Sequence, residues 1–416
     1  MNETSNDYSR PYRPWGVRAF NALSRVGGGG GQLHRDRLMN AARKRTGLGD
    51  FGDESFVPAL DQLLRSINQE AALTPFGRFV QKERIVSGLA NRLRAEALIA
   101  RHPEILAADL LPPLVIAGLQ RTGTTMLHRL LSADPQARSL ASWEALNPVP
   151  LAGDGDAQRK RRAKARQAER ALAYIAPEFF AIHPVEAEAP EEDVLLLDLH
   201  FMSQAPEATM HVPGYAAWLE EQDHTAAYAY LRRMLLVLQW QRGGGHWVLK
   251  TPHHMEFLDR LCEVFPEAKV IQTHRDPRKT MASFCSMVAH GRGVFSDRVD
   301  AHEVARHWVR KVERMMRRSI AARRAIGQER FLDVAYAELI TDPEGQLERI
   351  YAFAELDYSE SVRAAVAGAR RSNRPNKYGR HVYRLEDFGL DDATIDSVFG
   401  FYREHYAVVA EGEGAA

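Results

Sequence analysis

The stretch LVIAGLQRTGTT at residues 114–125 constrains the fold of this chain more than any other segment. An apolar run leads into Gly118 and Gly123, which have the spacing of the glycines in the phosphate-binding loop G-x-x-x-x-G-K-[ST]. In such a loop the glycines allow a tight turn, and the following helix directs its positive N-terminus at an anion. We therefore predict a buried strand, an anion-binding turn and a helix in succession.

The turn departs from the usual phosphate loop because Thr124 stands where lysine is expected. In nucleoside triphosphatases that lysine reaches the β- and γ-phosphates, and the next hydroxyl binds Mg²⁺. Here Thr124 and Thr125 offer hydroxyls and amides, and the cation is Arg121 within the turn. An arginine in that place suits a single terminal oxyanion, such as that of a 5'-phosphosulfate, and does not organise a triphosphate and its metal.

Beyond Pro112, short apolar segments alternate with helical stretches. The strand candidates are LVIAG, WVLK, KVIQTH and RFLDVA. This alternation predicts an α/β fold of P-loop type, a parallel sheet flanked by helices with its active site at the carboxyl ends of the strands. Before Pro112, apolar residues at spacings of three and four predict helices. We expect three parts: a flexible N-terminal arm at 1–34, a helical N-terminal extension at 35–110 and the α/β domain at 111–410.

The arm combines the basic, amphipathic piece WGVRAFNALSRV with a run of five glycines at residues 27–31. We expect it to pack on its own domain, and peripheral contact with a membrane surface is the alternative. No apolar stretch approaches about 20 residues and no secretory signal is visible, so we expect a cytoplasmic protein without a transmembrane segment. The basic run at residues 158–170 is interpreted as a solvated helix face, with an anionic partner as the alternative.

Overall composition excludes some classes of function. A formal net charge of +1 gives no indication of a nucleic-acid partner. The chain has two cysteines, Cys262 and Cys285, which cannot form a disulfide framework and lack the spacing of metal ligands. We predict that both fill the core and that no metal is bound.

A second anion site is indicated by AKVIQTHRDPRKTMASFCSM. Its apolar strand ends at Arg275, Pro277 stops it, and Ser283 follows in a helix at a separation of 283 − 275 = 8 residues. An arginine at the end of a strand and a serine about two helical turns later can both face one phosphate.

The segment PLVIAGLQRTGTTMLHRLLSADP resembles the 5'-phosphosulfate loop of sulfotransferases that use 3'-phosphoadenosine 5'-phosphosulfate (PAPS), in the branch with Arg-Thr/Ser-Gly-Thr-Thr. The resemblance extends over most of the chain from about residue 40. It implies a sulfotransferase with PAPS as sulfuryl donor. The residues that it assigns to the 5'-phosphosulfate are Arg121, Thr122, Gly123, Thr124 and Thr125.

The same resemblance assigns Arg275 and Ser283 to the 3'-phosphate of PAPS, because the family carries an arginine and a serine at this spacing. The family also brings a basic, glycine-containing segment near the C-terminus to that phosphate. In this chain the matching segment is NKYGR, which implies roles for Lys377 and Arg380.

Sulfuryl transfer to a hydroxyl requires a base near the acceptor and positive charge near the departing phosphate. In WVLKTPHHMEF, Lys250 ends a strand, and the family pattern Lys-Ser/Thr-Pro-x-His selects His254 as the base. A helix N-terminus disfavours imidazolium and would keep this histidine neutral. Glu144 in ASWEALNPVP is the rival base, similar to the glutamate of protein-tyrosine sulfotransferases. Lys250 and Arg121 would stabilise charge on the leaving phosphate.

Two other functions are compatible with the motifs. A small-molecule or nucleoside kinase would share the fold, although Thr124 replaces its lysine and the one aspartate in a strand candidate is Asp333 of RFLDVAY. A non-catalytic nucleotide-binding protein would not need the base and the cations. The expected acceptor is a hydroxyl of a small molecule, lipid or carbohydrate, with aromatic residues in EFFAIHP and VPGYAAWLE as candidate lining.

Overall fold

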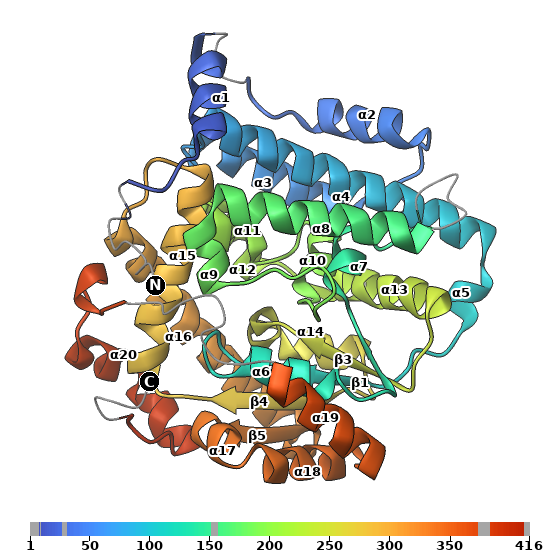
Figure 1. Ribbon diagram of the computed structural model, residues 1–416, viewed down its shortest axis with the longest axis vertical. Helices are drawn as coiled ribbons and strands as arrows, with labels where there is room; N and C mark the ends of the chain where they lie inside the picture. The colour runs from blue at the N-terminus through green and yellow to red at the C-terminus, as the bar shows by residue number, and fades with distance from the viewer. Residues whose placement is uncertain (1–7, 9, 27–30, 151–156, 373–382, 412–416) are drawn as a thin grey trace.

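The computed structural model describes residues 8, 10–26, 31–150, 157–372 and 383–411. Its centre is a parallel sheet of five strands in the order β2-β3-β1-β4-β5 (Figure 1). The strands are β1 (Pro113–Ile116), β2 (Ala137–Ser139), β3 (His246–Lys250), β4 (Lys269–His274) and β5 (Phe331–Ala335). The predicted α/β fold is confirmed, and four of these strands coincide with the predicted segments. The edge strand β2 was not predicted.

The central strands are apolar because helices bury both faces of the sheet. In β1, Leu114 and Ile116 face one hydrophobic cluster, and Val115 faces the other. Four helices pack on the first face: α6 (Thr124–Leu131), α17 (Tyr336–Thr341), α18 (Pro343–Ala354) and α19 (Glu360–Ser372). The second face is covered by α13 (Thr225–Gln241), α14 (Leu258–Val264), α15 (Pro277–Phe295) and α16 (Ala301–Ile326).

Helices precede the sheet in the chain, as the apolar spacing predicts. They are α1 (Trp15–Val26), α2 (Arg35–Thr46), α3 (Val57–Gln69), α4 (Pro75–Arg101) and α5 (Glu104–Ala107). Leu60 of α3 and Leu89 of α4 belong to the same hydrophobic cluster as Leu235 of α13. The described part of the arm also packs on the domain, because Tyr8 is buried and Arg13 donates to the carbonyl of Ser296. The boundaries at residues 34 and 110 stay predictions.

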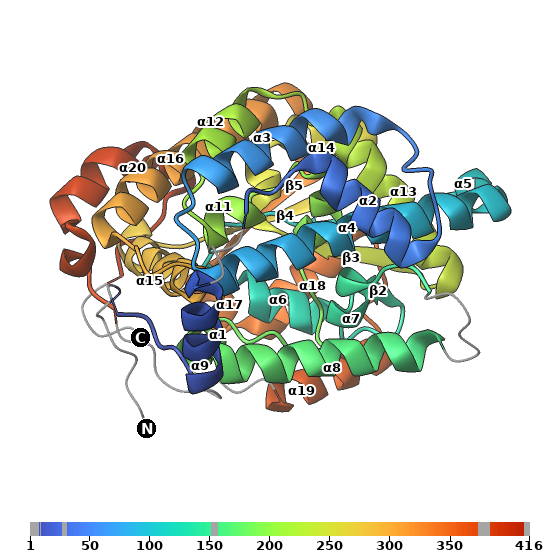
Figure 2. The ribbon, with the colours of Figure 1, turned by 90° about the horizontal axis from the view of Figure 1, so that it is seen from above.

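Helices of different lengths lie between β2 and α13 in the chain. They are α7 (Ser142–Leu146), α8 (Ala157–Ile175), α9 (Pro177–Ile182), α10 (Val194–Leu197), α11 (Ala205–Thr209) and α12 (Pro213–Glu221), while α20 (Asp392–Tyr406) follows α19. Figure 2 shows α8 lying along the outside of the molecule. Its basic run is not wholly solvated, since Arg161 is buried and donates to the carbonyl of Asn147 and to Gln241.

Two predictions from composition can be compared with the structure. Cys262 and Cys285 are both buried and unpaired, as expected of core residues, and burial raises the pKa of Cys285 to about 12. Among the described helices, none combines the length and the apolarity that crossing a membrane requires.

Candidate active site

The phosphate-type loop between β1 and α6 is tightly packed and conformationally strained. Arg121 and Gly123 have positive φ angles of 69° and 88°. Such an angle costs energy for a residue other than glycine and is often found at functional sites. Thr122 Oγ1 lies 2.6 Å from Thr273 Oγ1 of β4, and a methyl group on Gly118 would lie 1.9 Å from the same oxygen. The loop is therefore fixed against β4, and only glycine fits at position 118.

The two threonines that follow the loop open α6 and differ in access to solvent. Thr124 is buried, whereas Thr125 is exposed. Because Gly123 is the N-cap and has no side chain to accept from the first amides of α6, these amides are available to an anion at the helix N-terminus.

Two arginines from different parts of the chain meet beside this loop. Arg121 Nε donates to Ser283 Oγ of α15 at 2.9 Å, and Arg275 Nη1 donates to the carbonyl of Arg121 at 3.1 Å. The Arg275 guanidinium also lies over the ring of Tyr336, 3.9 Å from its centroid. Burial lowers the pKa of Arg121, and the charge of Arg275 lowers it further. Three predicted site residues are thus brought together, and an anion between the arginines would relieve their mutual repulsion.

A carboxylate from the C-terminal segment binds Arg275. Its Nε and Nη2 donate to the two oxygens of Glu411 at 2.8 and 2.9 Å, and the Glu411 amide donates to Asp276 Oδ2. Burial lowers the pKa of Arg275, but the hydrogen bonds to Glu411 outweigh burial and leave it raised. Glu411 therefore occupies the two guanidinium donors of Arg275, Nε and Nη2, which could otherwise bind a phosphate through two hydrogen bonds.

Lys250 ends β3 in register with Ile116, the last residue of β1, and so lies beside the start of the loop. Its ammonium is 2.5 Å from Glu192 Oε1, and the Thr251 hydroxyl donates to Glu192 Oε2 at 3.2 Å. Thr251 also caps the short helix η3 (Pro252–Glu256) by accepting from the amide of His253. Because β3, β1 and β4 are adjacent and parallel, Lys250, the loop and Arg275 lie together at the carboxyl ends of these central strands.

His254 is completely buried in a network behind Lys250. Its Nδ1 lies 2.9 Å from the Tyr228 hydroxyl, and its Nε2 lies 2.8 Å from Asp193 Oδ2. The other oxygen of Asp193 accepts from the Lys250 amide at 2.9 Å. The ring is thus enclosed between Tyr228 and Asp193, and Asp193 connects it to the backbone of Lys250. Because the ring is 0% exposed, it has no open face for an acceptor hydroxyl, and the assignment of His254 as the base stays a prediction.

Glu144 lies apart from this group, near the sheet edge formed by β2. Arg138 donates to both of its oxygens at 2.8 and 3.0 Å, and Arg242 and the Ala141 amide donate to Oε2. Burial raises the pKa of Glu144, but the two arginines outweigh burial and hold it below its usual value. A buried carboxylate whose oxygens are all occupied is a structural anion. This geometry does not favour Glu144 as a base, and that assignment stays a prediction.

We expect Glu144→Ala to lower the free energy of unfolding by about 3–5 kcal/mol, because Arg138 would keep a buried charge without a partner. Chemical denaturation measures this loss. In the matched control Glu188→Ala, the lost partner of Arg162 and Arg166 is surface-exposed, so the change should stay within about 1 kcal/mol. A fully stable Glu144→Ala protein without turnover would restore the catalytic role.

His183 was not predicted as a site residue, although its segment EFFAIHP was noted. It follows α9, where its amide donates to the Phe179 carbonyl, and its ring forms no hydrogen bond with any described residue. Burial lowers the pKa of His183; Glu191 and Glu192 act in the opposite direction, and Lys250 and Arg121 add to the lowering. A neutral imidazole thus lies within electrostatic reach of both cations of the site. A histidine without a surrounding motif gives no signal in the sequence.

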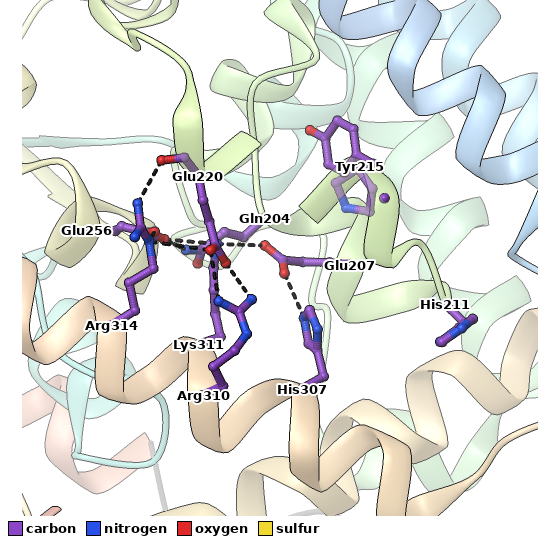
Figure 3. Close-up of polar contacts among 12 residues, drawn as sticks. Gln204, Glu207, His211, Tyr215, Glu220, Glu256, His307, Arg310, Lys311 and Arg314 are labelled. Carbon is purple, nitrogen blue, oxygen red and sulfur yellow. Dashed lines mark hydrogen bonds and ion pairs between the residues drawn. The ribbon is translucent and has the colours of Figure 1, made fainter. Parts of the chain in front are cut away.

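A buried ionic cluster supports the end of η3 (Figure 3). The ammonium of Lys311 in α16 lies 3.0 Å from Glu256, 3.2 Å from Glu220 and 3.4 Å from Glu207. Burial lowers the pKa of Lys311, but the carboxylates outweigh burial and raise it, so the lysine stays charged. Three carboxylates at one point are typical of a metal site, yet here an ammonium takes the central place. The cluster fixes η3 against α16.

Asp333, the carboxylate available to a kinase, is engaged elsewhere. It accepts from Arg323 at 2.6 and 2.9 Å and lies 2.8 Å from His274 Nε2. Lys377 and Arg380, which the resemblance assigns to the 3'-phosphate, lie outside the described residues.

The known proteins that this chain resembles in sequence and structure are sulfotransferases. A model of the sulfotransferase family matches residues 112–360. The sulfotransferase STF1 from Mycobacterium tuberculosis H37Rv is 32% identical and superposes with a TM-score of 0.79 over 89% of this chain and 99% of its own. STF9 from Mycobacterium avium is 29% identical, with a TM-score of 0.83 over 91% and 98%.

Among curated proteins, the omega-hydroxy-beta-dihydromenaquinone-9 sulfotransferase Stf3 of Mycobacterium tuberculosis is 27% identical over 278 residues. The matched region covers 60% of this chain and 64% of that protein, so the chain spans less than two thirds of this relative.

Proposed function

The chain belongs to the sulfotransferase family, and we propose that it transfers the sulfuryl group of PAPS to a hydroxyl of a lipid or other apolar acceptor. The observation that carries this proposal is the meeting of Arg121, Ser283 and Arg275 beside the strained loop. PAPS has two anionic ends, and a donor site for it needs two anion-binding positions within one nucleotide's length.

In the proposed donor complex, the loop residues bind the 5'-phosphosulfate and the β4–α15 residues bind the 3'-phosphate. The first set is Arg121, Thr122, Gly123, Thr124 and Thr125. The second set is Arg275 and Ser283, with Lys377 and Arg380 as proposed additions from the family resemblance. Support for the loop comes from its open helix N-terminus and from its arginine.

The proposed reaction forms a bond between the acceptor oxygen and sulfur and breaks the bond between sulfur and the 5'-phosphate oxygen. The products are a sulfate ester and 3'-phosphoadenosine 5'-phosphate (PAP). Lys250 and Arg121 stabilise the negative charge that develops on the departing phosphate, since Lys250 ends β3 beside the loop and Arg121 lies within the loop. This role requires Lys250 to share its ammonium between Glu192 and the donor.

We infer that His183 receives the proton of the acceptor hydroxyl. It is partly buried and has no hydrogen-bond partner among the described residues, and its neutral form is favoured by burial and by the two nearby cations. His254 keeps a place in the proposal as the residue that holds Asp193 against the Lys250 amide.

The proposed acceptor class follows from the relative and from the aromatic residue beside His183. The name of Stf3 says that it acts on omega-hydroxy-beta-dihydromenaquinone-9, which is a lipid. In this chain a small cavity of about 30 Å³ is lined by Tyr8, Tyr12, Phe179 and Val294 and also by Arg13, Glu178 and His290. The Phe179 ring, one wall of the pocket, lies 5.9 Å from the His183 ring. An apolar acceptor whose hydroxyl lies near His183 would contact the aromatic ring of Phe179.

The reaction can be tested with radiolabelled PAPS and a panel of primary alcohols that includes long-chain and isoprenoid members. We expect label in the apolar alcohols and little in sugars. Transfer of label to sugars alone would contradict the acceptor class, and phosphoryl transfer from ATP·Mg²⁺ would contradict the reaction itself.

The contact between Glu411 and Arg275 gives a separate prediction. Glu411→Gln should tighten PAP binding roughly fivefold, because about 1 kcal/mol of competing charge-assisted contact is removed. Calorimetric titration measures the change, and Glu404→Gln, an exposed glutamate of α20, is the control with unchanged affinity. Weaker PAP binding by Glu411→Gln would contradict the placement of the 3'-phosphate at Arg275.

A further inference from the structure

Helix α1 turns its apolar side to the solvent. Trp15, Ala19, Ala22, Leu23 and Val26 recur at positions i, i+4, i+7, i+8 and i+11, which places them in one stripe along the helix. Trp15 and Leu23 are each 75% exposed and Val26 is 90% exposed. In an ordinary surface helix this stripe would face the core. Figure 1 shows α1 at the edge of the molecule.

A narrower side of α1 attaches it to the protein. Val17 and Asn21 are its buried residues, and Asn21 Oδ1 accepts from the Phe76 amide at the start of α4. Phe20 packs against the rings of Phe76 and Phe79 at centroid distances of 6.0 and 5.7 Å. Phe20 and Phe79 remain partly exposed beside the stripe and enlarge it. Exposed apolar patches of this kind are typical of interaction surfaces.

The surroundings of the stripe are basic. Residues 10–26 contain four arginines and no aspartate or glutamate. Arg10 and Arg18 form no ion pair with any described residue, whereas Arg13 and Arg25 both contact Asp297. Arginines that flank an exposed aromatic and aliphatic stripe are typical of helices that lie in the head-group region of a bilayer.

We propose that α1 docks this protein on the surface of a lipid bilayer that contains anionic lipids. Trp15, Leu23 and Val26 enter the boundary between head groups and acyl chains, and Arg10 and Arg18 contact the lipid phosphates. A second copy of this chain is a poor occupant, because docking α1 on α1 would bring together Arg10 and Arg18 of both copies, which have no ion-pair partner among the described residues.

Docking in this orientation also has a consequence for the acceptor. The residues just before α1, among them Tyr8 and Tyr12, form one wall of the pocket that reaches Phe179. The bilayer surface, in which a lipid acceptor is dissolved, would then lie near this pocket. This last step rests on the proposed function, whereas the docking itself does not.

The test is sedimentation of the full chain with vesicles of phosphatidylcholine alone and with vesicles that also contain phosphatidylglycerol. We expect binding to the anionic vesicles that decreases with added salt. The variant W15E/L23E/V26E should bind at least about 100-fold more weakly. Each substitution removes the favourable free energy of moving an apolar side chain from water into the bilayer. Arg18→Glu should weaken binding to anionic vesicles and leave the residual binding to neutral vesicles unchanged.

The matched control is Trp240→Glu, which changes an aromatic residue that is 45% exposed on α13 and should bind like the unchanged protein. All variants should bind PAP with unchanged affinity, which separates failure of docking from failure of the proposed function. Absence of vesicle binding by the unchanged chain, or unchanged binding by W15E/L23E/V26E, would overturn the proposal. A dimer that only this triple variant dissociates would also overturn it.

Discussion

Arg275→Ala should weaken the binding of PAP by about 100-fold or more. In the proposed complex the guanidinium of Arg275 binds the 3'-phosphate through two charge-assisted hydrogen bonds, each worth about 1.5–3 kcal/mol. The same fork already binds the two oxygens of Glu411, so its geometry suits an anion with paired oxygens. Calorimetric titration gives the affinity directly.

Arg275→Lys is the informative companion. A lysine keeps the charge but loses the planar fork, so PAP affinity should fall between that of Arg275→Ala and that of the unchanged protein. Adenosine 5'-phosphate lacks the 3'-phosphate, and its affinity should change little in either variant. An equal loss for both nucleotides would place Arg275 elsewhere in the donor site.

His183→Ala should lower kcat by about 10²–10⁴-fold, the usual contribution of a positioned general base. PAP affinity should stay within about twofold, because His183 is proposed to face the acceptor and not the nucleotide. Steady-state kinetics and PAP titration on the same protein separate the two effects. His34→Ala, which changes an exposed histidine before α2, should leave both quantities unchanged.

The pH profile distinguishes a base from a merely structural histidine. The pKa of His183 is lowered from 6.5, so its neutral form persists below that pH. We expect kcat/KM to be flat above pH 6.5 and to fall only in more acidic solution, as protonation removes the base. His183→Ala should lose this acidic limb. A limb that survives in His183→Ala, or full activity of that variant, would assign the proton to another group, such as Glu192.

The proximity of the loop and Arg275 was predictable because both follow apolar strands in the sequence. The runs before Gly118 and Arg275 are long enough to identify β1 and β4, and parallel neighbours bring their carboxyl ends together. The strand β2 escaped prediction because Ala-Arg-Ser is short and polar and gains its pairing only from β3. Local sequence therefore identifies central strands better than edge strands.

The proposed base, His183, could not be predicted, because burial decides which titratable group is available. The partners of Glu144 are Arg138, six residues away, and Arg242, 98 residues away, and only the folded chain brings both to one carboxylate. In the same way, Asp193, which precedes α10, and Tyr228 of α13 come from distant parts of the sequence to contact His254. The sequence pattern indicates which side chains have the right chemistry, whereas the fold determines which of them are free to react.

The amphipathic character of α1 was also visible in the sequence, but its orientation was not. The spacing of Trp15, Leu23 and Val26 predicts an apolar stripe and cannot say whether the stripe faces the core or the solvent. Its orientation depends on Asn21 and Val17, whose contacts with α4 exist only in the folded chain.

The central claim, that the three strand ends form a site for a 3',5'-bisphosphate, is tested most directly by calorimetry without any acceptor. PAP, adenosine 5'-phosphate and ATP·Mg²⁺ would each be titrated into the unchanged chain. The account predicts tight binding of PAP and weak binding of the other two, because only PAP places an anion at both Arg121 and Arg275. Preference for ATP·Mg²⁺, or equal affinity for PAP and adenosine 5'-phosphate, would contradict it.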